Sequence, residues 1–151
     1  MTATQQPNPF GGPPPRPKGP SGPRSGFWKR AGALVADGVI IVVVAQILRG
    51  IDRDLADFLV VPGGLVYFAL LEGGPRGQTL GKRIFGLRVI DFGYGGPIGT
   101  GRGFIRNLVR LLSWFVFGLG YLWMLWDREK QTWHDKAAGT VVVPIDSYPV
   151  G

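Results

Sequence analysis

The sequence predicts an all-α membrane protein with three hydrophobic helical segments, a disordered Pro/Gly-rich N-terminal tail and a short two-stranded cytoplasmic β element. Three observations support this class. Charged residues are almost absent from residues 31–48, 58–71 and 111–126. Aromatic residues gather at the ends of the first and third stretches, as in the aromatic belts of membrane proteins. Basic residues concentrate before and between the stretches, which gives the chain a net charge of +7.

The N-terminal tail comprises residues 1–26, which contain eight Pro and five Gly and no apolar periodicity. Such a composition cannot bury enough apolar surface to fold. We expect either a basic spacer attracted to anionic lipids or a proline-rich docking arm built on the PPRP run at 14–17. The membrane domain then comprises residues 27–143, and a short C-terminal tail comprises residues 144–151.

The first hydrophobic helix carries an acid in its middle. Its start, Phe27 and Trp28, forms an interfacial anchor, and with it the run reaches the roughly 20 residues of a spanning helix. A charge at mid-helix costs about 2.5–3.5 kcal/mol on insertion scales, so we expect Asp37 to be neutralised. Arg30 is seven residues away, about 10 Å along the axis, and is expected at the interface instead. Four alternatives remain for stabilising Asp37: a proton, a bound cation, an arginine from residues 102–110 or backbone donors.

The second and third runs reach spanning length only with flanking polar residues, such as Asp57 and Glu72, whose side chains extend to the interface. A soluble protein is the alternative. Three apolar helices in so short a chain, however, leave little polar surface to cover them. We expect three spans, although Gly118-Leu119-Gly120 would permit a break or re-entrant turn in the third run.

The distribution of Lys and Arg predicts the orientation. Five precede or open the first helix and seven lie within residues 72–110, whereas residues 49–57 have two, with three Asp. We therefore expect a multi-pass protein of the bacterial inner (plasma) membrane with its N-terminus and the 72–110 loop in the cytoplasm. Residues 85–91 and 140–146 are typical of short strands. If they pair, the C-terminal tail lies on the same side as the loop, whereas three spans place it outside.

The basic loop supplies two kinds of candidate site. Arg102, Arg106 and Arg110 share one face of a predicted helix. We expect Arg106 and Arg110 to be candidate counter-ions of the buried acid. We also expect contacts to anionic lipid head groups from four basic residues: Lys82, Arg83, Arg88 and Arg102.

Several motifs of enzymes are incomplete in this chain. Residues 73–83 lack the spacing of a phosphate-binding P-loop, and residues 93–101 do not satisfy the dinucleotide-binding GxGxxG pattern. His134 is the only histidine and there is no Cys, so no metal site and no nucleophile–base pair is indicated. We expect a protein that is not an enzyme, with no cofactor, no metal and no nucleic-acid partner.

Four segments in order resemble a known family: FWKRAGALVADGVI (27–40), GQTLGKRIFGLRVID (77–91), RNLVRLL (106–112) and QTWHDKAAGTVVV (131–143). With these the chain resembles the RDD family of small bacterial membrane proteins, named for an arginine and two aspartates. The resemblance implies that these are Arg30, Asp37 and Asp135. The tail is similar to that of proline-rich antigen-type members from actinobacteria. The family is commonly suggested to take part in transport, and some members have been linked to cation/proton exchange.

Our leading functional hypothesis is therefore transport of an ion or small solute, with Asp37 as the intramembrane charge carrier. Three short helices enclose little cavity, so we expect a homo-oligomer or a partner membrane protein. Two rivals remain. One is a non-catalytic membrane scaffold in which the Arg/Asp network is structural, and the other is a lipid-binding accessory protein.

Overall fold

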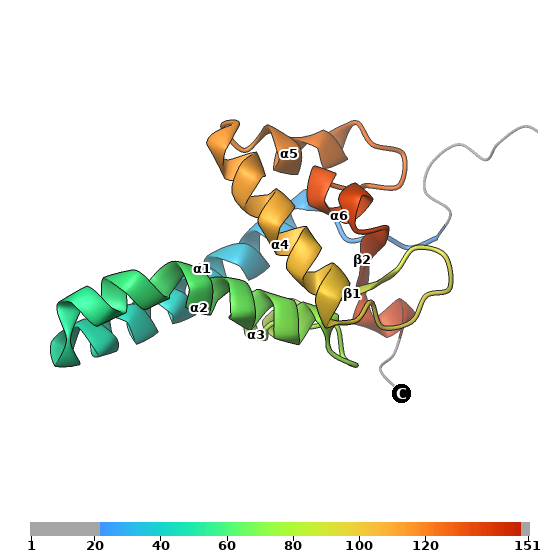
Figure 1. The fold of residues 1–151 in the computed structure, drawn as a ribbon. Coiled ribbons are helices and arrows are strands. Elements are labelled where there is room, and N and C mark those ends of the chain that lie inside the picture. Colours follow the sequence, from blue (N-terminus) through green and yellow to red (C-terminus); the bar gives the residue numbers. More distant parts are fainter. Residues whose placement is uncertain (1–21, 149–151) are drawn as a thin grey trace, which may run out of the picture.

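A computed structural model describes residues 22–148; most of the predicted tail (residues 1–21) and the last three residues lie outside this range. The first two apolar runs form α1 (Phe27–Ile51) and α2 (Arg53–Gly73). Asp52 alone joins them. Its N–H donates to the carbonyl of Leu48, and its side chain caps α2 by accepting from the N–H of Leu55. The result is a long helical hairpin that projects away from the rest of the molecule (Figure 1).

Both helices of the hairpin are long and apolar enough to cross a membrane. Large apolar side chains are exposed along its projecting part, among them Val39, Val43, Ile47, Phe58 and Val61. In water, an exposed apolar surface of this extent would favour association or aggregation. The hairpin is therefore suited to a lipid environment.

The third hydrophobic run is not the continuous helix that its composition predicts. It forms α4 (Thr100–Phe115), α5 (Leu119–Leu122) and the 3-10 helix η1 (Trp123–Leu125), with a bend of 113° after α4. Gly118 has a left-handed backbone with φ of 72°, which glycine adopts at little cost, and its N–H donates to the carbonyl of Ser113. The break thus falls in the glycine-containing segment that the sequence indicated.

The two predicted strands are confirmed as β1 (Leu87–Asp91) and β2 (Thr140–Pro144), which pair antiparallel with Val89 opposite Val142 at the centre. Paired strands lie on one side of a membrane. If the hairpin spans a membrane, the chain that leaves β1 for α4 would return to the same side after η1. The end of the predicted tail joins this ribbon, because the N–H of Ser25 donates to the carbonyl of Val142.

Each strand follows a one-turn helix, so the ribbon consists of two similar helix–strand units. The helices are α3 (Leu80–Ile84) and α6 (Trp133–Ala137). A Gln-Thr pair precedes each one, at residues 78–79 and 131–132, and the threonine side chain caps the helix. The glutamine amide donates to the first carbonyl of the following strand, at 2.7 and 2.8 Å. The two units are related by an approximate twofold axis through the central strand pair.

The apolar core is small, and α4 turns a polar face toward it. One core cluster comprises Ala33, Leu87, Val89, Ile98 and Val142, and a second comprises Ile90, Val141 and Val143. The inward face of α4 buries polar side chains: Arg106, Asn107, Arg110 and Ser113. Its outward face exposes apolar ones: Phe104, Ile105, Leu108 and Leu112. This arrangement, polar inside and apolar outside, brings charged side chains into the centre of the molecule.

Candidate functional site: a buried charge cluster beside a cavity

Glu72 is a buried carboxylate at the centre of a group of cationic side chains. It is the penultimate residue of α2 and its side chain is fully buried. Three cations contact its two oxygens: Lys82 Nζ at 2.5 Å, Arg106 Nε at 3.0 Å and Arg110 Nη2 at 2.8 Å. Lys82 comes from α3, whereas the two arginines lie one turn apart on α4. A buried carboxylate needs such partners, because an unpaired charge is costly inside a protein.

Asp135 is the second carboxylate. Arg30 Nη1 lies 2.6 Å from its Oδ2, and Arg106 Nη1 donates to its Oδ1. Burial alone would raise the pKa of Asp135, but the charges of Arg106 and Arg30 outweigh this effect and lower the pKa below its ordinary value. Asp135 also accepts from the N–H of Thr132 in a capping box, so its position on α6 is fixed.

Arg106 connects the two carboxylates, since its guanidinium contacts both Glu72 and Asp135. We call the six linked side chains the charge cluster: Arg30, Glu72, Lys82, Arg106, Arg110 and Asp135. Within the described residues, the ion pairs of its four cations are with these two carboxylates alone. Residues 1–21 contain no Asp or Glu that could add a further one. The cluster therefore carries two positive charges in excess.

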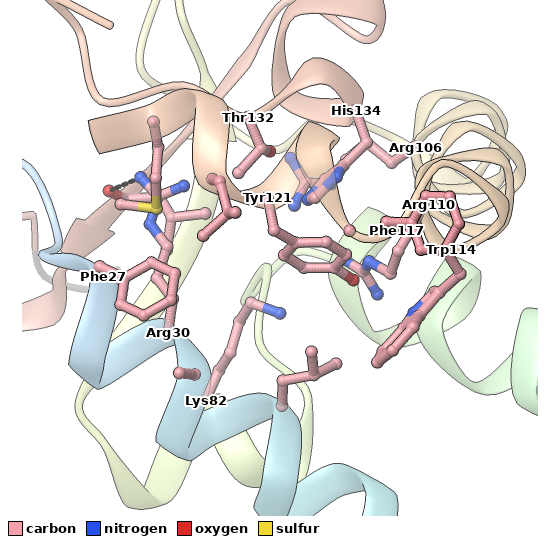
Figure 2. A pocket seen from close by; sticks show the side chains of 16 residues that line it. Phe27, Arg30, Lys82, Arg106, Arg110, Trp114, Phe117, Tyr121, Thr132 and His134 are labelled. Carbon is pink, nitrogen blue, oxygen red and sulfur yellow. Dashed lines mark hydrogen bonds between the residues drawn. The ribbon is translucent and has the colours of Figure 1, made fainter. Parts of the chain in front are cut away.

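A cavity of about 290 Å³ lies against the charge cluster. All four cations of the cluster line it, whereas neither carboxylate does. Figure 2 shows Lys82 and Arg110 approaching the ring of Tyr121 from different sides of this cavity. The remaining wall is mostly apolar and includes Phe27, Leu34, Trp114, Phe117 and Leu122. The cavity thus combines a cationic floor with an apolar wall.

Four buried polar atoms of residues that line the cavity have no hydrogen-bond partner within the part of the chain that the structure describes. They are Arg30 Nε, Arg110 Nε, the Tyr121 hydroxyl and His134 Nδ1. Burial keeps the pKa of His134 well below its usual range, so its ring is neutral. Burial also lowers the pKa of Lys82, although its proximity to Glu72 opposes this effect. Unsatisfied buried donors are rare in native proteins and point to a missing partner.

Asp37 lies apart from the charge cluster and is held by neutral donors. The hydroxyls of Tyr67 and Thr79 donate to it at 2.8 and 2.6 Å, and the N–H of Gly81 donates at 2.7 Å. Backbone donation was one of the four alternatives for this acid. The contact is close, because a Cβ on Gly81 would lie 2.1 Å from the carbonyl oxygen of Ala33. Asp37 thereby fixes the start of α3 against α1.

The predicted counter-ions therefore have different acids as partners. Arg106 and Arg110 pair with Glu72, and Arg106 also pairs with Asp135; neither forms an ion pair with Asp37. The reason is the way the helices pack. Helix α4 lies against the end of α2 and against α6, whereas α3 covers Asp37. Of the three residues in the family charge motif, two are in direct contact and Asp37 is separate.

The residues predicted to contact lipid head groups are mostly engaged inside the protein. Lys82 and Arg88 are buried, with Lys82 bound to Glu72 and Arg88 donating to backbone carbonyls. Arg102 pairs with Asp91 and donates to the carbonyls of residues 138 and 139. Arg83 is exposed, so its side chain is available for a contact with lipid head groups. Lys82 and Arg88 therefore do not reach the outer surface, and a lipid head group could meet Lys82 only within the cavity that this residue lines.

Sequence reasoning missed Glu72, which was taken for a flanking residue that extends to the interface. It also missed Tyr67 and Thr79 as the donors to Asp37. One signal was available: the Gln-Thr pair occurs twice, and the third residue after each threonine is Lys82 or Asp135. Both of these equivalent positions enter the charge cluster. A search for internal repeats would have marked them as a pair.

Comparison with known proteins identifies the family. Residues 55–139 match the RDD family. The chain belongs to the RDD family. Family membership and the apolar helices α1 and α2 together point to a membrane protein. No solved structure matches the chain.

Curated relatives are of two kinds. A proline-rich antigen homolog of Mycobacterium tuberculosis is 35% identical over 95 residues, which are 61% of this chain and 40% of the relative. The proline-rich antigen of Mycobacterium leprae is 36% identical over 72 residues, 48% of this chain and 29% of the relative. The uncharacterized protein YckC of Bacillus subtilis is 35% identical over 129 residues, 78% of this chain and 83% of the relative. The match thus spans well under half the length of the mycobacterial relatives.

Proposed function

We propose that this RDD protein is a non-enzymatic membrane protein that binds an anionic ligand in the cavity beside the charge cluster. One observation carries the proposal: three buried cations and the half-buried Arg30 line a cavity, and within the described residues only two carboxylates, neither of which lines the cavity, pair with them. A buried excess of charge is costly unless a partner neutralises it. An anion in the cavity supplies that partner. The unsatisfied donors on the wall supply its hydrogen bonds.

Tyr121 provides the sharpest test, because this residue lines the cavity and its buried hydroxyl has no hydrogen-bond partner within the described residues. Binding of inorganic phosphate to the purified full chain in neutral detergent is measured by isothermal titration calorimetry. We expect Tyr121→Phe to fold normally and to bind more weakly. Tyr94→Phe is the matched control, since Tyr94 is an exposed residue whose hydroxyl donates to the carbonyl of Pro97. If wild type shows no anion binding at any accessible concentration, the proposal fails.

We further propose that the N-terminus, the ribbon and the charge cluster face the cytoplasm of a plasma membrane. The excess of Lys and Arg in residues 72–110 over residues 49–57 supports this orientation. The chain has no Cys, so single cysteines report topology without background. Arg83→Cys should be shielded from a membrane-impermeant thiol reagent in intact cells, and Arg53→Cys, at the opposite end of the hairpin, should react. The reverse labelling would overturn the orientation.

Transport through Asp37 is the second candidate. The observation that favours it is that Asp37 is buried and held by two hydroxyls and one N–H, with no ion pair among the described residues. Hydroxyl groups both donate and accept, so the same geometry accommodates a protonated carboxyl. Ion flux into proteoliposomes with wild-type protein should exceed that with Asp37→Asn. Equal flux would exclude Asp37 as a carrier, and stability loss without any flux would support a structural role.

A further inference from the structure

We infer that the anion is the phosphate group of a lipid phosphomonoester, whose apolar chain leaves the cavity along Trp114 and Phe117. This inference rests on the proposed anion-binding function and deepens it. Three independent features carry it: the charge of the cavity, its depth in the membrane and its size and wall.

The charge favours a doubly charged group. The cluster contains two more cations than carboxylates, and all of its members except the half-buried Arg30 are buried. A phosphomonoester carries about −1.5 to −2 at neutral pH, whereas a phosphodiester or a carboxylate carries about −1. Arginine is also the side chain whose planar donors match phosphate oxygens, and three of the four cations are arginines. A monoester therefore neutralises the excess, and a diester leaves one charge unbalanced.

The depth places the cavity at the level of lipid head groups. Arg30 lies in the first turn of α1, two residues after Trp28 of the aromatic pair Phe27 and Trp28. Glu72 is the penultimate residue of α2. Both therefore lie at the same end of the hairpin, where the spanning segments meet the ribbon. Phosphate groups of a bilayer leaflet occupy this interfacial region, at the edge of the hydrocarbon core.

The size and wall of the cavity indicate an amphiphile that is held only by its head. A volume of about 290 Å³ is at the lower end of ligand pockets and suits a head group without its chain. At the rim, Trp114 is 61% and Phe117 is 96% exposed, although both line the cavity. The outward apolar face of α4 continues from this rim. An acyl or prenyl chain that leaves the cavity there would lie on an apolar surface already suited to lipid.

The test compares four probes on the full chain in neutral detergent by calorimetry: dioctanoyl phosphatidic acid, dioctanoyl phosphatidylglycerol, dioctanoyl phosphatidylcholine and inorganic phosphate. We expect the monoester lipid to bind at least tenfold more tightly than either diester lipid or inorganic phosphate. Tyr121→Phe should lower the affinity for the monoester lipid about tenfold, which corresponds to the loss of one hydrogen bond to a charged group. Trp114→Ala should weaken the binding of the lipid more than it weakens the binding of inorganic phosphate.

Each outcome separates the two proposals. Equal affinity for inorganic phosphate and phosphatidic acid would overturn the lipid inference but keep the anion-binding function. Equal affinity for phosphatidylglycerol and phosphatidic acid would overturn the monoester assignment. Binding of the lipids that is unaffected by Tyr121→Phe and Trp114→Ala would place them outside this cavity and overturn the inference. Absence of binding by every probe would overturn both proposals.

Discussion

Replacing Glu72 by Gln removes the central negative charge of the cluster while keeping the shape of the side chain. Lys82, Arg106 and Arg110 contact this carboxylate at 2.5, 3.0 and 2.8 Å, and Glu72 itself is fully buried. The substitution leaves four cations against the single carboxylate of Asp135. Breaking a buried ion pair by removing one partner costs about 3–5 kcal/mol, and we expect a loss of this size in the free energy of unfolding.

The assay is unfolding in mixed micelles by increasing SDS, followed by the fluorescence of the five Trp residues. Asp57→Asn is the matched control, because its ion pair with Arg49 lies in the opposite part of the hairpin with side chains 41% and 51% exposed. An exposed pair of this kind contributes about 0–1 kcal/mol. Adding Lys82→Gln to Glu72→Gln restores the excess to two charges and should recover part of the loss. A Glu72→Gln protein as stable as the Asp57→Asn control would refute the reasoning.

Three further predictions concern the surroundings of the charge cluster. Gly81→Ala should destabilise by about 1–3 kcal/mol through the clash with the carbonyl of Ala33, whereas Gly101→Ala, which meets open space, should be neutral or slightly stabilising in the same SDS unfolding assay. Because the folded-state pKa of Asp135 lies below its ordinary value of 3.8, its stabilising contribution is complete above that pH and is lost as the pH falls further. Unfolding measured from pH 7 to 2.5 should show this decline, and Asp135→Asn should flatten it; a wild-type profile flat to pH 2.5 would contradict it. Arg30→Lys should destabilise the fold, because one ammonium group cannot replace a guanidinium that reaches both Asp135 and the carbonyl of Val142. A variant as stable as wild type would count against this double contact.

Much of the fold follows from local patterns in the sequence. Long apolar runs predict α1 and α2, because a helix that spans a membrane needs about 20 mostly apolar residues. The segments rich in β-branched residues predict both strands. The spacing of Arg102, Arg106 and Arg110 predicts a helix with a basic face, and the glycines at 118 and 120 indicate where the third run breaks. These signals are local, so they can be recognised without the tertiary structure.

The charge cluster could not be assigned in the same way. The sequence indicates that Arg106 and Arg110 need an acid, but Asp37, Glu72 and Asp135 are all available, and local patterns do not show which one α4 approaches. The structure decides it, because α3 covers Asp37 with neutral donors and leaves the other two carboxylates facing α4. The cavity depends on the bend after α4, which turns Tyr121 back toward the arginines.

The separation of the charge partners along the chain also bears on how the protein is made. Glu72 precedes Arg106 by 34 residues, and Arg30 precedes Asp135 by 105 residues. When the ribosome has completed only the hairpin, Arg30 and Glu72 are therefore at the membrane surface without these partners. The cluster closes only after α6 has been synthesised, near the end of the chain. A chain truncated before α6 retains the apolar helices and the partners of Glu72, but it lacks Asp135, so Arg30 has no acid to pair with at the start of α1.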